Sequence, residues 1–258
     1  MKLYIKFFMM HLRSQMQYKA SFYMMAVGQF LVSFSAFAGI YFMFERFGSV
    51  RDFTYPEVLL CFAVVLIAFS ISECFARGFD TFDGVISGGE FDRALVRPRN
   101  EIFLVLAAKI ELTRIGRLLQ ALIILAYAIP SSGVIWSAEK IVLIIAMICS
   151  GVVIFCGLFI IYAGICFFTT QGLEFMNIFT DGGREFGRYP FAVYGNGVLR
   201  FFTYVIPLAL FQYYPFLYLI GKSDNTLFML LPFIGMLFIF PCMLLWRVGI
   251  RHYKSTGS

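Results

Sequence analysis

Residues 141–173 read IVLIIAMICSGVVIFCGLFIIYAGICFFTTQGL and contain no charged side chain. A transmembrane helix needs about 20 consecutive apolar residues, because the hydrocarbon core of a bilayer is about 30 Å thick. This stretch exceeds that minimum, so a helix formed by it must tilt or extend beyond the bilayer. It predicts an integral membrane protein.

The composition of the whole chain points to the same class. Hydrophobic residues make up 60% of the 258 positions, charged residues only 14%, and phenylalanine alone occurs 33 times. A soluble domain is about 45–50% apolar and about 25% charged. A globular core could not bury this many phenylalanines beneath so little polar surface, so lipid must solvate many of them.

Further apolar stretches predict five more spans, at 20–44, 53–72, 102–129, 201–221 and 226–246. The first half of the third stretch carries Lys109, Glu111, Arg114 and Arg117. We expect this half to be an interfacial or cytoplasmic extension of one long helix whose lipid-embedded part begins near Leu118. The predicted fold is therefore an all-α integral membrane protein with six transmembrane helices, forming a single domain over residues 1–258.

Lysine and arginine positions predict the orientation of the spans. With a cytoplasmic N-terminus, the inner segments are 1–19, 73–117, 174–200 and 247–258. They hold 4, 7, 3 and 3 basic residues, 17 in total, whereas the outer segments hold 4. Basic residues are enriched on the cytoplasmic side of membrane proteins. Both termini are therefore expected to be cytoplasmic, and the net charge of +6 needs no nucleic-acid partner.

The N-terminal segment, residues 1–19, interleaves basic residues with large apolar ones. Leu3, Phe7, Met10 and Leu12 recur at roughly helical spacing, a pattern typical of a helix that lies in the headgroup region. We expect an interfacial helix here. The alternative is that this segment is only the cytoplasmic start of the first span.

The fifth predicted span is irregular, because Pro207 and Pro215 each remove a backbone donor. Interrupted helices occur at membrane depth only where protein or water satisfies the freed groups. Two interpretations remain open here: a re-entrant hairpin on the outer side, around residues 213–220, or one kinked span.

The sequence offers little evidence of catalytic or metal chemistry. The middles of the six predicted spans lack ionisable residues, which mark most ion and proton paths. The six cysteines lie in or beside apolar runs without CxxC pairs, and the two histidines lie in basic terminal segments. Nucleotide-binding glycine motifs are absent. We expect no enzyme activity, no metal site and no cofactor on this chain.

One polar segment is more organised than a plain loop. Residues 73–101, ECFARGFDTFDGVISGGEFDRALVRPRNE, alternate acidic and basic residues and place large apolar residues between them. Gly88–Gly89 predicts a break between short helices, and Arg97–Pro98 predicts the end of the second one. Such an amphipathic unit suits docking onto another protein. Glu73 and Arg77 stand four residues apart, a spacing that can brace the end of the second span.

Residues 88–98, GGEFDRALVRP, resemble the G-E-[FIL]-D-x-x-L-[LV]-R-P motif that follows the second span in a branch of the ATP-binding-cassette type-2 permeases. Residues 189–215, YPFAVYGNGVLRFFTYVIPLALFQYYP, are similar to the stretch that leads into span five in that branch. The resemblance covers essentially the whole chain. It implies the exporter permease fold, with six spans and an interfacial start.

The resemblance also implies which residues contact a partner. A coupling segment would lie within residues 77–100 and a second contact within residues 174–200. The candidates for coupling to an ATPase are Asp83, Gly89, Glu90, Phe91, Asp92, Arg93 and Arg97 in the first segment, and Asp181, Arg184 and Glu185 in the second.

By the same resemblance, the chain is expected to be the transmembrane subunit of an ATP-driven exporter in the plasma membrane. A separate ATP-binding subunit on the cytoplasmic face would hold ATP and Mg, and a second permease, identical or homologous, would complete the transporter. Apolar, aromatic spans suit an amphipathic, lipid-like or drug-like substrate, whose binding residues are unknown. An ion-coupled carrier or channel and a membrane-embedded lipid-handling enzyme or assembly factor remain alternatives.

Overall fold

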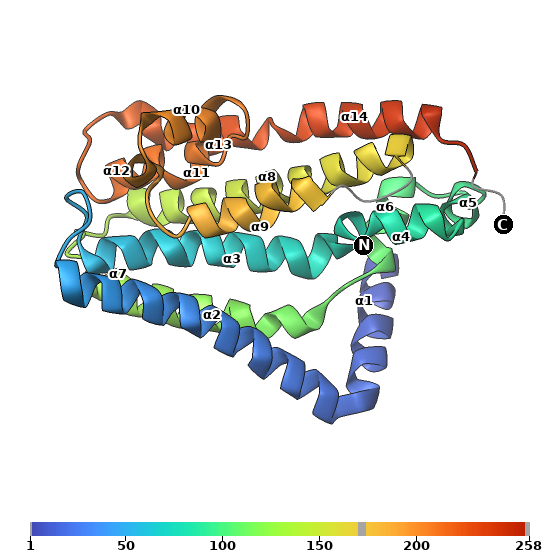
Figure 1. Cartoon of the computed structure of the whole chain (residues 1–258), viewed down its shortest axis with the longest axis horizontal. Coiled ribbons are helices and arrows are strands. Elements are labelled where there is room, and N and C mark those ends of the chain that lie inside the picture. The colour runs from blue at the N-terminus through green and yellow to red at the C-terminus, as the bar shows by residue number, and fades with distance from the viewer. Residues whose placement is uncertain (1, 170–173, 256–258) are drawn as a thin grey trace.

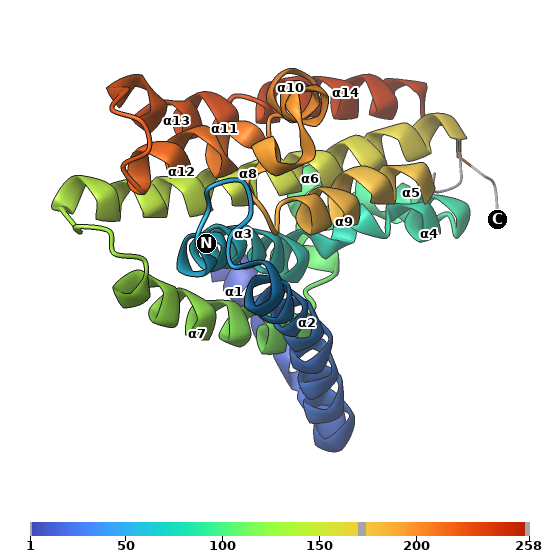
Figure 2. The same cartoon turned by 60° about the vertical axis from the view of Figure 1, so that its left-hand side comes forward.

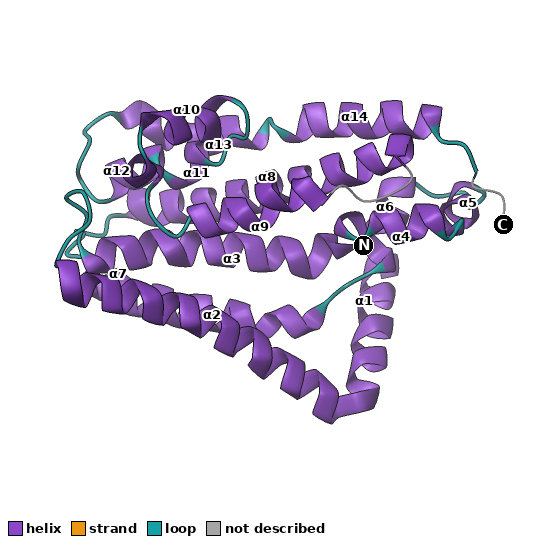
Figure 3. Ribbon diagram, viewed as in Figure 1, coloured by secondary structure: helices purple, strands orange, loops and turns teal. Residues whose placement is uncertain are grey.

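The computed structural model describes residues 2–169 and 174–255, and within them the chain is helical, without a strand (Figures 1 and 3). Five helical segments are long and apolar enough to cross a membrane. The principal helices of these segments are α2 (Lys19–Phe47), α3 (Tyr55–Asp80), α7 (Ile115–Ser131), α8 (Ala138–Thr169) and α14 (Ile239–His252). The predicted end of the fourth span, Leu173, lies outside the described residues.

Helix α3 is the centre of the bundle, with α8 on one side and α2 and α7 on the other (Figures 1 and 2). Its residues from Glu57 to Ser70 are all buried. This follows from the sequence, because a run that is apolar all round the helix can be covered only by other helices or lipid. We call the two ends of the bundle the α5 end and the α12 end, after the short helices that lie there in Figure 1.

The N-terminal segment forms a separate helix, α1 (Lys2–Gln15), which runs across the direction of the long helices (Figure 1). A short 3₁₀ turn, η1 (Met16–Tyr18), separates α1 from α2. Tyr4, Phe8 and Leu12 of α1 pack against a small core of Cys74, Ile110 and Leu112. Its other face exposes Ile5, Met9 and Met10. The helix therefore has one face that packs on the bundle and another that is free to contact lipid.

The third predicted span is not one long helix, so that expectation is wrong. The chain forms α6 (Glu101–Ala108), leaves helical geometry at Lys109 (φ −140°, ψ 115°), and resumes through η2 (Leu112–Arg114) into α7. The backbone N–H of Glu111 donates to the carbonyl of Cys74 in α3 over 3.0 Å. At the break the chain gives up helical hydrogen bonds. In their place, the Glu111–Cys74 hydrogen bond holds the linker against α3.

The fifth predicted span, residues 201–221, forms no helix of spanning length. The chain instead forms three short helices, α10 (Asn196–Tyr204), α11 (Ala209–Gln212) and α12 (Tyr214–Leu219). Pro207 lies between the first two, and Pro215 lies in the first turn of α12, where its missing N–H costs nothing. The interpretation as one kinked span is therefore wrong. The last span is also interrupted, with η5 (Thr226–Met229) and α13 (Leu231–Met236) before α14.

Residues 174–200, predicted as a second cytoplasmic segment, run along the side of the bundle towards the α12 end (Figure 1). They form η3 (Glu174–Met176), α9 (Asn177–Phe186) and η4 (Phe191–Tyr194). The guanidinium of Arg184 lies 4.9 Å from the ring centroid of Phe69, near the middle of α3. At the far end of the segment, Arg51 donates to the carbonyl of Ala192 over 2.6 Å. Sequence reasoning missed this because helix α9 is short and polar.

Gln212 holds the irregular part of the bundle in place. It is fully buried, and its amide donates to the carbonyls of Tyr189 over 2.8 Å and Gly187 over 3.4 Å. Those carbonyls belong to non-helical backbone that would otherwise be buried without a partner, at a cost of about 1–3 kcal/mol each. One side chain thus stabilises the break between α9 and η4.

Candidate functional site

The segment after α3 forms two short helices at the α5 end, α4 (Phe82–Ser87) and α5 (Glu90–Leu95). The Gly88–Gly89 pair separates them, as its sequence predicts. Gly89 has φ +65°, a left-handed conformation that residues with a Cβ rarely adopt. The chain can therefore reverse within two residues and place α5 beside α4. We call these two helices the α4–α5 unit.

Aromatic side chains fix the α4–α5 unit to the bundle. Phe82 and Phe91 lie with ring centroids 5.2 Å apart, and each packs against Phe167 of α8 at 5.1 Å. Trp246 of α14, fully buried, lies 5.2 Å from Phe82. We call this group, which also includes Phe79 and Tyr253, the aromatic anchor. Each such pair adds about 0.5–1.5 kcal/mol beyond area burial, so the anchor attaches the unit to α3, α8 and α14.

The C-terminal segment adds polar contacts to this anchor. The hydroxyl of Tyr253 donates to Asp92 over 3.0 Å, and that of Ser255 donates to the same carboxylate over 2.6 Å. Burial, and then the neighbouring Asp92 carboxylate, raise the pKa of Tyr253 to about 12. The tyrosine hydroxyl therefore remains a hydrogen-bond donor throughout the physiological pH range.

The predicted coupling residues of this unit have different positions. Phe91 is fully buried, and the half-buried Asp92 accepts hydrogen bonds from Tyr253 and Ser255. Glu90, Arg93 and Arg97 are exposed. Sequence reasoning did not select the neighbouring Leu95 and Val96, which are 44% and 83% exposed. The end of the α4–α5 unit therefore carries a small exposed apolar patch, Leu95 and Val96, beside the charged residues Glu90, Arg93 and Arg97.

A groove of about 650 Å³ runs between the α4–α5 unit and α6. The predicted residues that line it are Asp83, Glu90, Phe91, Arg93 and Arg97. The opposite wall includes Val105 and Lys109. At the closest approach of α3 to α6, a Cβ on Gly78 would lie 2.1 Å from the carbonyl oxygen of Val105, so only glycine fits.

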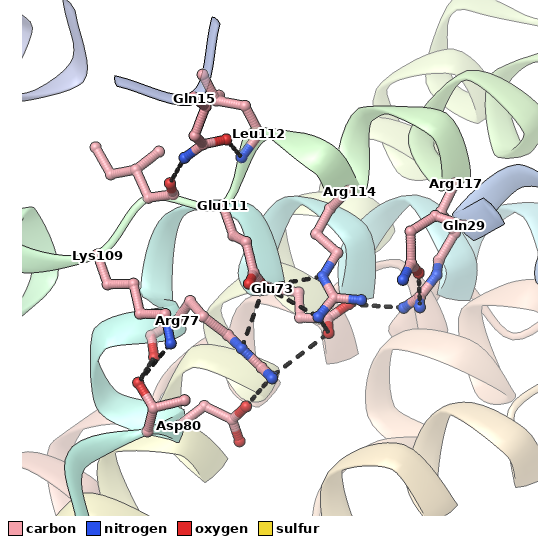
Figure 4. A network of polar contacts seen from close by, with 12 residues as sticks. Gln15, Gln29, Glu73, Arg77, Asp80, Lys109, Glu111, Leu112, Arg114 and Arg117 are labelled. Atoms are coloured by element: carbon pink, nitrogen blue, oxygen red, sulfur yellow. Dashed lines mark hydrogen bonds and ion pairs between the residues drawn. The ribbon is translucent and has the colours of Figure 1, made fainter. Parts of the chain in front are cut away.

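Buried charges form a network between the α4–α5 unit and the middle of the bundle (Figure 4). Glu73 of α3, 4% exposed, pairs with Arg117 at 2.6 Å, Arg114 at 3.2 Å and Arg77 at 3.5 Å. Arg117 also donates to Gln29 of α2 over 2.6 Å. We call these residues, with Asp80 and Glu111, the Glu73 network. It joins three helices, α2, α3 and α7, at one level.

Arg77 has a wider role than bracing one turn of α3. It pairs with Asp80 one turn further along and with Glu111 in the α6–α7 linker at 3.3 Å. Lys109 of the same linker donates to Thr81 over 3.3 Å. Gln15 of α1 accepts from the backbone N–H of Leu112 over 3.1 Å (Figure 4). The network thus attaches both α1 and the linker to the base of α3.

The residues expected in a second surface contact lie apart from the α4–α5 unit, on α9. Arg184 pairs with Asp181 at 3.4 Å and with Glu185 at 2.7 Å, and Glu185 also pairs with Arg188. Arg184 lies over the Phe69 ring near the middle of α3. Three of the predicted site residues therefore belong to a charged helix that packs on the side of the bundle, with Asp181 and Glu185 still 55% and 39% exposed.

Sequence reasoning missed several residues that complete these sites. Arg114, Arg117 and Glu111 stood out as charges in an apolar run, but the partner of Arg117 lies 44 positions away, beyond any helical spacing rule. No local sequence pattern pointed to the other members of the aromatic anchor, Phe167, Trp246 and Tyr253. In the described residues, no group of three or more His, Cys, Asp or Glu side chains is placed to hold a metal ion.

A scan against protein-family models matched residues 30–257 to the model described as "ABC-2 family transporter protein". The match begins within α2 and covers the other long helices, the α4–α5 unit and α9 together. Searches of curated proteins and of solved structures found no significant match.

Proposed function

The chain belongs to the ABC-2 transporter family, and from this premise we propose that it is a permease subunit driven by a separate ATP-binding subunit through the α4–α5 unit. In this proposal ATP and Mg bind to the partner subunit, on the cytoplasmic face. A second permease, identical or homologous, completes the transporter. The direction of transport is outward.

The surface of the α4–α5 unit is the observation that carries this proposal. Val96 and Leu95 are exposed beside Arg93 and Arg97, although the large apolar side chains Phe82, Ile86 and Phe91 of the same unit are buried. Docking surfaces combine an apolar centre with a charged border, and exposed arginine is enriched in them. The inner side of this helix pair is packed against the bundle, and its outer side exposes an apolar patch beside charged residues. Such a surface suits the attachment of another protein.

The aromatic anchor supports transmission of a movement from this surface. A displacement of the α4–α5 unit acts on Phe167 of α8 and on Trp246 of α14, and α3 leads into the unit directly through Thr81. Close-packed interiors transmit strain because their side chains have little free volume. Nucleotide-driven motion of a partner would therefore act on three helices at once, of which α3 and α8 extend to the α12 end (Figure 1).

A groove at the α12 end supports the proposed substrate class. It has a volume of about 440 Å³ and lies between α2 and α7, with aromatic walls that include Phe37, Tyr41, Tyr55 and Tyr127. Such a lining suits the apolar part of an amphipathic, lipid-like or drug-like molecule. The large apolar side chains along α2, such as Met24 and Phe42, are exposed and require lipid or a second permease to cover them.

The proposal is tested by co-purification in mild detergent from cells that also express the ATP-binding subunit. Wild-type permease should recover an ATP-hydrolysing partner. Val96→Asp should lose most of it, because the substitution places a charge at the centre of the docking surface. Ile135→Asp is the matched control, since Ile135 is 85% exposed but lies at the opposite end of the bundle.

Two results would contradict the proposal. One is substrate transport by the purified permease without any ATP-binding subunit, which an ion-coupled carrier or channel would show. The other is equal recovery of the partner with Val96→Asp and Ile135→Asp, which would place docking elsewhere.

A further inference from the structure

A small polar cavity lies between α2, α3 and α9, at a level where lipid would surround a single chain. Its volume is about 30 Å³. Its polar lining consists of Ser33, Arg117, Arg184, Glu185 and Arg188, and its apolar walls include Phe62 and Leu66. We call it the arginine crevice.

The contacts of α9 define the depth of the arginine crevice. A Cβ on Gly187 would lie 2.9 Å from the Val65 side chain, and Arg184 lies over Phe69. Both partners lie near the middle of α3, a helix of spanning length. Ionisable residues at such depth are costly and usually line a substrate or ion path. The charges of α9 are therefore better explained by a ligand than by packing alone.

The crevice has more hydrogen-bond donors than acceptors. Each guanidinium carries five N–H donors and no acceptor. The lining contains three guanidinium groups and one carboxylate, Glu185, while Glu73 and Asp181 approach Arg117 and Arg184 from outside the cavity. Arg188 pairs only with Glu185 among the described residues. Most of its donors are therefore free to bind a ligand.

Among the residues that the structure describes, one polar group in the wall of the crevice lacks a partner, and so does one on α7 that does not line the crevice. Ser33 lines the crevice, is 5% exposed, and has no hydrogen-bond partner for its hydroxyl within the described residues. Gln120, one turn beyond Arg117 on α7, is 3% exposed, and neither of its amide atoms has a partner in the same part of the chain. Buried polar groups are nearly always bonded. An unpartnered hydroxyl in the wall of a donor-rich cavity indicates a missing acceptor.

We propose that the arginine crevice binds the acidic headgroup, a phosphate or carboxylate, of an amphipathic molecule that this permease carries. This inference rests on the proposed transport function and narrows its substrate class to anionic amphipaths. Guanidinium groups bind carboxylate and phosphate oxygens in bidentate geometry. The apolar wall of Phe62 and Leu66 accommodates the first carbons of the attached chain.

The dimensions fit a headgroup and not a whole lipid. A cavity needs about 10–15 Å³ of this measure to hold one water, so 30 Å³ admits about two water-sized groups. That room suits two oxygens of one acidic group, with the rest of the molecule outside the crevice. Inorganic phosphate can present two oxygens in the same way, and an experiment must separate these two sources of the same chemistry.

The test measures binding of dodecyl phosphate to the purified permease in dodecyl maltoside by isothermal titration calorimetry. Wild-type protein should bind it saturably, and Arg188→Gln should weaken binding by about tenfold or more, as expected for loss of a hydrogen bond to a charged group. Arg188 is a suitable target because Glu185 keeps Arg184 as its partner. Arg99→Gln, which removes an exposed arginine at the α5 end, should bind like wild type.

Further arms identify the ligand class. Dodecyl trimethylammonium should not compete with dodecyl phosphate, and inorganic phosphate should compete only at far higher concentration. Ser33→Ala should weaken binding several-fold without changing the elution profile of the protein. This second variant keeps the test decisive if Arg188→Gln does not fold.

Equal binding by wild type, Arg188→Gln and Ser33→Ala would overturn the proposal. Inorganic phosphate that binds as tightly as dodecyl phosphate would also overturn it, because the site would then recognise a free anion. The assay contains only this chain. A failure here therefore leaves docking at the α4–α5 unit untouched, and loss of that docking would not alter binding in the crevice.

Discussion

Glu73 is the residue on which the largest number of buried charges depends. Three arginines from α3, η2 and α7 share its carboxylate. Taking a charge out of water costs several kcal/mol, and partners restore this only when geometry and hydrogen bonding are good. The arrangement is therefore more a device for fixing the relative positions of helices than a source of stability.

Replacement of Glu73 by alanine should destabilise the protein by about 3–5 kcal/mol, because Arg117 would remain buried without its carboxylate. The measurement is the midpoint of denaturation in detergent. Glu139→Ala, at an exposed position in the first turn of α8, serves as control and should cost less than about 1 kcal/mol. Similar midpoints for the two variants would contradict the prediction, because they would show that the buried Arg117 does not need the Glu73 carboxylate.

At this scale the sequence predicted local pairs but not distant ones. The spacing of Glu73 and Arg77 on one helix predicted their proximity, and the structure places them 3.5 Å apart. The shorter contact, to Arg117 at 2.6 Å, depends on how α7 packs against α3. The spacing of residues in a single sequence does not predict how two helices pack against each other.

Among the elements, the α4–α5 unit illustrates what local sequence can determine. Gly88–Gly89 and Arg97–Pro98 predicted two short helices, and the structure has them at 82–87 and 90–95. The same reasoning failed for α9, because a polar helix of ten residues inside a membrane bundle is stable only through its tertiary contacts. Likewise, the break between α6 and α7 depends on the bond from Glu111 to Cys74 of α3.

Gly89→Ala should loosen the α4–α5 unit, because a left-handed conformation costs a residue with a Cβ about 1–2 kcal/mol. Hydrogen–deuterium exchange followed by mass spectrometry should show faster exchange across residues 82–95. Gly84→Ala is the matched control in the same unit, since an added Cβ there meets open space in a normal helix. Exchange rates that do not differ between the two variants would argue against a conformational role for Gly89.

For the molecule as a whole, the structure reduces the number of basic residues on the predicted inner side, but that side still holds most of them. Arg184 and Arg188 lie along the side of the bundle, and Arg200 lies in α10 towards the α12 end (Figure 1), so 17 − 3 = 14 basic residues remain on the predicted inner side against 4 + 1 = 5 towards the outer side. The bias still predicts a cytoplasmic α5 end. The number of spans was harder to predict, because hydropathy cannot distinguish a span from several short apolar helices such as α10, α11 and α12.

Cysteine labelling tests this orientation. In a variant without the six native cysteines, Ser137→Cys at the α12 end should react with a membrane-impermeant maleimide on intact cells. Ser87→Cys at the α5 end should react only after the membrane is permeabilised. Both positions are exposed in the structure, so access to the reagent depends on the side of the membrane. The reverse pattern would invert the predicted topology.

The aromatic anchor also gives the molecule a built-in optical probe. The chain has only two tryptophans, Trp246 in the anchor and Trp136 at the opposite end, where its indole donates to Ile129. In a Trp136→Phe variant, the remaining tryptophan is Trp246, whose indole ring packs against Phe79, Phe82 and Phe167. Its emission wavelength would report any separation of these rings in real time, without an added dye.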